Sequence, residues 1–193
     1  MHKKSDTIVR ELDAMSQQLQ DYVLEQRLFK TITVFGHGPR LIKMTLGAML
    51  ERMAELEKLT SDSEAAQVVR QAKEALAREQ RSQPTRFFKL LAREAKSYTD
   101  SWKWFLQNCW EGNGECRSAY AQEVGIRLRL ERLLKYAGNH AELAESRRRI
   151  RSLDQRLRTI WEESNTPIIG DKHQFPPEDY WWLYGQPRPS DCG

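Results

Sequence analysis

The four histidines are the first residues to consider for metal binding or acid–base chemistry, and none sits in a recognisable motif. His2, His37, His140 and His173 are scattered along 193 residues, and none has an acidic residue three positions before it. The Glu-x-x-His pairing of helical di-iron sites is therefore absent. The chain also lacks Cys-x-x-Cys and His-Glu-x-x-His, the spacings that hold zinc. We expect no metal and no cofactor.

Nucleophilic catalysis has no motif in this sequence either. The Gly-x-Ser-x-Gly turn of hydrolases is missing. Serine, histidine and acidic residues assembled only by the fold are invisible at this level, so the sequence leaves catalysis open. It favours a protein that is not an enzyme.

Arginines give the strongest binding signal. Several recur at three- and four-residue spacings along residues 139–164, on the face opposite the apolar seam, and the preceding helix adds more. A row of guanidinium groups suits a phosphate backbone, because each neutralised phosphate releases counterions. The alternative is a solvated helix with internal ion pairs, which the absence of any nucleic-acid-binding signature favours. The candidate nucleic-acid contacts are Arg127, Arg129, Arg132, Arg148, Arg151 and Arg158.

Charge is unevenly distributed along the chain. Residues 1–126 carry 19 Lys and Arg against 17 Asp and Glu, a net of +2. Residues 127–158 carry ten against four, a net of +6, and residues 159–193 carry two against six, a net of −4. A basic helical region is thus followed by an acidic C-terminal segment.

The segment from Asn165 onward differs from the rest in composition. It contains five prolines and a cluster of large aromatic residues. Disordered tails are poor in aromatics, so we expect the segment either to pack on its own domain or to dock on a partner protein. Intramolecular packing is the preferred interpretation. The candidate partner-binding residues are Phe175, Tyr180, Trp181, Trp182 and Tyr184.

The three cysteines show no disulfide framework. Cys109 and Cys116 flank a Gly-Asn-Gly turn and are close enough in sequence to approach each other. We nevertheless expect both to be reduced, since an odd count without framework spacing is atypical of secreted disulfide domains. No signal-peptide pattern or membrane-length apolar run is present. We predict a cytoplasmic protein without membrane contact.

The elements that position these residues are predicted to be helices. Residues 85–111 carry apolar and aromatic residues at alternating spacings of three and four, which predicts a long central helix. Residues 5–31 hold a similar seam for about three heptads, which fits a bundle helix better than a coiled coil. The thin apolar face of residues 61–81 predicts a peripheral helix. The six expected helices are residues 5–31, 39–59, 61–81, 85–111, 115–137 and 139–164.

One short stretch has two interpretations. The β-branched run Ile32–Val34 precedes Gly-His-Gly-Pro, an order that resembles the strand and glycine loop of a phosphate-binding turn. The glycine spacing fits no phosphate loop, and no second strand is evident. We therefore expect Gly36 or Gly38 to end the first helix and Pro39 to begin the next.

Together these features predict an all-α fold of about six helices. Residues 1–164 would form a helical bundle domain, and residues 165–193 an extended proline- and aromatic-rich segment packed on it or docked on a partner. The leading hypothesis is a non-enzymatic interaction protein, a scaffold or accessory subunit that binds other proteins or itself through helices. The alternative is a nucleic-acid-binding subunit that uses the arginine-rich face.

Overall fold

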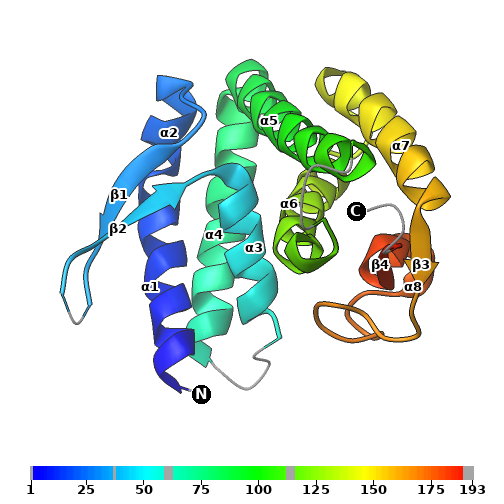
Figure 1. The fold of residues 1–193 in the computed structure, drawn as a ribbon. Helices are drawn as coiled ribbons and strands as arrows, with labels where there is room; N and C mark the ends of the chain where they lie inside the picture. The colour runs from blue at the N-terminus through cyan, green and yellow to red at the C-terminus, as the bar shows by residue number, and fades with distance from the viewer. Residues whose placement is uncertain (1, 37, 59–62, 112–115, 189–193) are drawn as a thin grey trace. The chain divides into compact units, whose positions relative to one another are not determined.

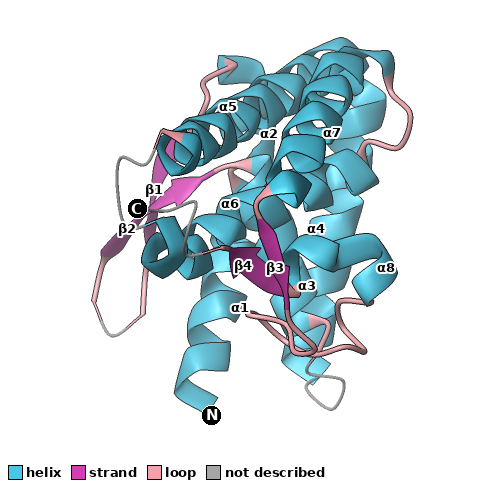
Figure 2. Ribbon diagram, turned by 45° about the vertical axis from the view of Figure 1, so that its right-hand side comes forward, coloured by secondary structure: helices cyan, strands magenta, loops and turns pink. Residues whose placement is uncertain are grey.

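The computed structural model describes residues 2–36, 38–58, 63–111 and 116–188, and most of these residues are helical (Figures 1 and 2). This confirms the predicted all-α class at the level of secondary-structure content, although two small sheets were not expected. The helices are α1 (His2–Gln17), α2 (Leu19–Glu25), α3 (Leu46–Leu56), α4 (Ser63–Ser82), α5 (Pro84–Trp110), α6 (Cys116–Tyr136), α7 (Ala144–Thr159) and α8 (Pro177–Tyr180), with 3₁₀ turns η1 (Ala141–Leu143) and η2 (Trp181–Leu183). The strands are β1 (Lys30–Val34), β2 (Arg40–Met44), β3 (Trp161–Glu163) and β4 (Gly185–Pro187).

The chain divides into two compact units. Unit 1 comprises residues 1–95 and 132–143, and unit 2 comprises residues 96–131 and 144–193. Helices α5 and α6 each contribute one part to each unit.

The core of unit 1 includes the apolar seam of α1 and α2. Leu12 and Met15 of α1 and Leu19 of α2 are inaccessible to solvent, so the heptad pattern in the sequence marks the buried face here. The helix is interrupted at Gln18, and α2 then ends at Gln26, which adopts a left-handed conformation with φ of 54°. The predicted single helix over residues 5–31 is therefore too long.

A β-hairpin replaces the junction that the sequence predicted between two helices. Strand β1 pairs with β2 in antiparallel register, with Ile32 opposite Ile42 (Figure 1). Strand β2 lies where a helix was expected, because Pro39 belongs to the turn and Thr45 is the residue that caps α3, by accepting from the Ala48 N–H at 3.0 Å. The second strand was missed because its alternation covers only five residues.

Helix α4 packs against α1, α2 and α3, so the expectation of a peripheral helix is wrong. Seven of its residues are buried. Small side chains such as Ala65 and Ala72, both fully buried, let neighbouring helices approach closely. A narrow apolar face therefore does not indicate a weakly packed helix when its residues are small.

Unit 2 contains the described part of the proline- and aromatic-rich segment. Strand β4 of that segment pairs with β3, and Gly185, with φ of 144°, lies in the pair. A Cβ at Gly185 would lie 2.2 Å from the Glu162 carbonyl oxygen, so only glycine fits. Phe175, Trp182 and Tyr184 are each at most 4 % exposed. Residues 165–188 thus contribute to the core of this unit.

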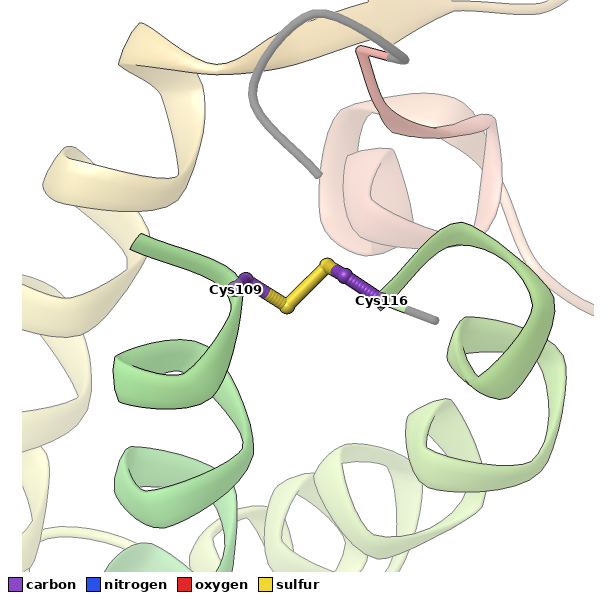
Figure 3. Close-up of a disulfide and its surroundings, with 2 residues drawn as sticks. All are labelled: Cys109 and Cys116. Carbon is purple, nitrogen blue, oxygen red and sulfur yellow. A yellow bond between two sulfur atoms is a disulfide. The ribbon is translucent and has the colours of Figure 1, made fainter. Parts of the chain in front are cut away.

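The cysteines form a disulfide, contrary to the expectation that both are reduced. Cys109 near the end of α5 and Cys116 at the start of α6 have Cα atoms 5.1 Å apart and are bridged (Figure 3). Their separation of seven residues across a helix–helix junction allows the approach. The cysteine count therefore gives no support for a reducing compartment, and the cytoplasmic location stays a prediction.

Candidate functional site

The first candidate residue of the arginine-rich face is buried in unit 2. Arg127 on α6 is 3 % exposed, and its guanidinium lies 2.9 Å from Glu131 and 2.9 Å from Asp154. The same group stacks 3.7 Å from the ring centre of Trp182. Burial lowers the pKa of Arg127, but the two carboxylates outweigh it and hold the pKa above its ordinary value. This side chain joins α6, α7 and the C-terminal segment.

The other candidate arginines differ in their surroundings. Arg148 and Arg151 are exposed on α7, and Arg148 pairs with Glu145 one turn away. Arg158 lies 3.9 Å over the ring of Trp181. Arg132 is in unit 1, 3.5 Å from Glu51, while Arg129 is partly exposed. The six residues therefore do not present one continuous row of solvent-facing guanidinium groups.

The candidate partner-binding aromatics lie in a continuous cluster within unit 2. Trp181 and Trp182 have ring centres 6.3 Å apart, and Tyr180 contacts Trp182 at 5.4 Å. Phe175 and Tyr184 are joined by a hydrogen bond in which the Tyr184 hydroxyl donates to the Phe175 carbonyl at 2.5 Å. Phe175, Trp182 and Tyr184 are buried, while Tyr180 and Trp181 are half-buried.

The described residues hold no cluster of metal-ligating side chains, because they contain no group of three or more His, Cys, Asp or Glu side chains placed to hold a metal ion. No helix in the described part is both long and apolar enough to span a bilayer. The remaining candidate features lie in unit 1: a buried carboxylate, Glu94, and an exposed β-hairpin.

A buried carboxylate fixes the base of the hairpin. Glu94 on α5 is 1 % exposed and accepts hydrogen bonds from the N–H groups of Leu46 at 2.7 Å and Gly47 at 2.9 Å, the first turn of α3. The Tyr22 hydroxyl lies 2.6 Å from the same carboxylate. Burial raises the pKa of Glu94 to about 7, against the opposing effect of these hydrogen bonds. Nothing in the sequence pattern marks Glu94, since it is one acidic residue within a helix.

The hairpin has one covered and one open face. Ile32 and Val34 are each 6 % exposed, and β1 packs on α1. Residues that alternate with them point the other way. Thr31 faces Lys43 and Thr33 faces Leu41 across the pair. The Lys43 ammonium lies 4.9 Å over the ring of Phe29. We call this set the outer hairpin face: Phe29, Thr31, Thr33, Phe35, Leu41 and Lys43.

Large apolar side chains on this face are open to solvent. Phe35 is 74 % exposed, Leu41 is 70 % and Phe29 is 45 %. Only two other large apolar residues of the described chain outside residues 24–41 are comparably exposed, Trp104 and Ile168. Grouped apolar exposure of this kind marks interaction surfaces.

The hairpin region carries only positive charge. Residues 26–50 contain four Lys and Arg and no Asp or Glu, in a chain with 27 acidic residues. Glu25 and Glu11 lie outside the region and pair with three of its cations: Glu25 with Lys30 at 2.8 Å and with Arg27 at 3.7 Å, and Glu11 with Arg40. The outer hairpin face has no acidic side chain of its own.

Comparisons with known proteins give no assignment. No family model, no curated protein and no solved structure matches this chain.

Proposed function

We propose that this protein is a non-enzymatic scaffold that assembles with copies of itself, by docking the outer hairpin face of one copy on an acidic segment of another. The observation that carries the proposal is the exposure of Phe35 and Leu41, at 74 % and 70 %, on a face without acidic residues. An apolar, basic surface selects an apolar, acidic partner.

The chain supplies such a partner in its own unit 2. Residues 161–179 contain five Asp and Glu against one Lys, a net of −4. Glu163, Asp171 and Glu178 are exposed. The same stretch presents apolar side chains for Phe35 and Leu41 to contact, because Ile168 is 36 % exposed and Pro176–Pro177 is open to solvent.

Charge also decides against a symmetric contact between two hairpins. Glu25 and Glu11 offset part of the charge of residues 26–50, but the Lys43 side chains of two outer hairpin faces would still meet as like charges, which opposes association. A contact between two different surfaces is heterologous, so repetition gives rings or open chains. That property is what a scaffold requires.

The nucleic-acid hypothesis receives less support from the side-chain positions. Arg127 is buried in ion pairs, and Arg158 stacks on Trp181. Arg148, Arg151, Arg156 and Arg158 are exposed on α7, but Arg148 pairs with Glu145, and Arg156 and Arg158 stack on tryptophan rings. A guanidinium that already has such a contact gives it up on binding a phosphate, which reduces the gain from counterion release.

Sedimentation velocity across a wide range of protein concentration tests self-assembly. We expect wild-type protein to form larger species with a dissociation constant of about 1–100 µM, since the hairpin face is small. The double variant Phe35→Ser, Leu41→Ser should stay monomeric, because it lacks the apolar contacts of the interface. It should keep its fold, because both side chains are exposed.

The matched control is Trp104→Ser, which removes another aromatic that is 65 % exposed but lies on α5. It should assemble as wild type does. A wild-type protein that is monomeric at every concentration, or a hairpin double variant that assembles normally, would contradict the proposal.

A further inference from the structure

A pocket lies between the turn of the hairpin and helix α1, within unit 1. Its volume is 390 Å³. Thr7 and Arg10 of α1 form one side, and the end of β1, the turn and the start of β2 form the other. The hairpin strands lie beside α1 in Figure 1. The residues from the hairpin are Val34, Phe35, Gly36, Gly38, Pro39 and Arg40.

The pocket has an excess of positive charge. Among the residues that the structure describes, the ionisable ones that line it are Arg10 and Arg40. Arg40 pairs with Glu11, and Glu11 also pairs with Arg52, so one carboxylate is shared by two guanidinium groups. Arg10 has no ion pair and no hydrogen bond within the part of the chain that the structure describes. At least one full positive charge is therefore unmatched.

Backbone donors add to this charge. Gly36 and Gly38 line the pocket, and neither N–H group finds an acceptor among the described residues. Unengaged backbone N–H groups of residues that line a pocket are available as donors to an anion.

Glycine at position 36 is what lets the arginine approach the turn. A Cβ at Gly36 would lie 2.6 Å from Nη1 of Arg10. The guanidinium is thus held against the backbone of the turn, and any larger residue at position 36 has to displace it.

We propose that this pocket binds a phosphate group carried on an apolar body. Donors come from α1 and from two positions of the turn, an arrangement that suits the several oxygens of a phosphate better than the two of a carboxylate. Val34, Phe35 and Pro39 supply apolar walls for the group that carries the phosphate. Phe35 lines both this pocket and the outer hairpin face, but the binding of the phosphate rests on Arg10 and the turn and does not depend on self-assembly.

Calorimetric titration with phenyl phosphate, at protein concentrations where the chain is monomeric, tests the site. Wild-type protein should bind, and Arg10→Gln should bind at least about tenfold more weakly, because charge-assisted hydrogen bonds are lost. Gly36→Ala should weaken binding in the same direction by displacing Arg10. The matched control is Arg70→Gln, which removes an exposed arginine of α4 and should leave binding unchanged.

Two further ligands test which chemical groups the pocket recognises. Inorganic phosphate should bind more weakly than phenyl phosphate, and benzoate more weakly still. Equal binding of inorganic and phenyl phosphate would overturn the role of the apolar walls, and tighter binding of benzoate would overturn the phosphate assignment. The site itself is refuted if wild-type protein does not bind, or if Arg10→Gln and Arg70→Gln lose affinity equally.

Discussion

Glu94 should make the stability of this protein depend on pH in a direction opposite to that of most carboxylates. Its side chain is buried where α2, α3 and α5 meet, and the pKa is raised to about 7 chiefly by burial. The groups that face it are the Tyr22 hydroxyl, the Thr45 hydroxyl and the N–H groups of Leu46 and Gly47. No charged side chain contributes to the shift.

The hydrogen bond from Tyr22 opposes this shift, because it stabilises the ionised carboxylate. The Tyr22 hydroxyl lies 2.8 Å from the Leu28 carbonyl oxygen and 2.6 Å from Oε1 of Glu94. A hydroxyl has one proton, so it can donate to only one of these acceptors. The Leu28 carbonyl therefore competes with Glu94 for this proton, and burial remains the larger effect on the pKa of Glu94.

Thermodynamic linkage between protonation and folding gives the sign and size of the pH effect on the unfolding free energy. The folded state keeps a proton on Glu94 between its ordinary pKa of 4.5 and about 7, while the unfolded state does not. Stability from this group is therefore fully present below the ordinary value and is lost as pH rises through the folded value. At about 1.4 kcal/mol per pH unit, the loss amounts to about 3 kcal/mol.

Denaturant unfolding of wild type and Glu94→Gln between acidic and mildly alkaline pH measures the effect. The variant loses one acceptor and so has a constant cost of about 1–3 kcal/mol, but it has no titration at this site. The difference in unfolding free energy between the two proteins should shrink by about 3 kcal/mol as pH rises. A difference that stays constant, or grows with pH, would refute this account of Glu94.

Two other predictions concern unit 2. Reduction of the Cys109–Cys116 disulfide should lower the unfolding free energy by about 2–3 kcal/mol, the value for a short closed loop. Thiol titration checks that reduction is complete. No loss of unfolding free energy would mean that the bridge does not constrain the unfolded chain. Trp182→Ala should cost about 3–5 kcal/mol in chemical denaturation, because the ring is 2 % exposed and covers Arg127. Trp104→Ala, at an exposed position, should cost below about 1 kcal/mol, and equal costs would contradict the packing of the C-terminal segment.

The long helix shows what could be read directly from the sequence. Residues 85–111 were expected to be helical, and α5 spans Pro84–Trp110. Leu91, Ala95 and Trp102 of the predicted seam are fully buried. A pattern sustained over many turns is decisive, because one face must be covered for the helix to be stable.

Short elements, and contacts between residues far apart in the sequence, could not be predicted from local sequence patterns. The hairpin depends on a five-residue strand whose partner lies across a glycine-containing turn. Glu94 and Tyr22 are 72 positions apart, and no local spacing connects them. Arg127 looks like its exposed neighbours in the sequence, because its burial depends on Asp154 and Trp182.

The most direct test of the scaffold proposal is a mixing experiment with charge-reversal variants. One variant carries Arg27→Glu and Lys43→Glu in the hairpin region, and the other carries Glu163→Lys and Glu178→Lys in the acidic segment. Each should sediment as a monomer alone, since its two surfaces then repel or lack a complement. The equimolar mixture should recover a complex, because the intact hairpin of the second variant can dock on the intact acidic segment of the first. A mixture that stays monomeric while wild-type protein assembles, or single variants that assemble as well as wild type, would contradict docking of the hairpin on the acidic segment.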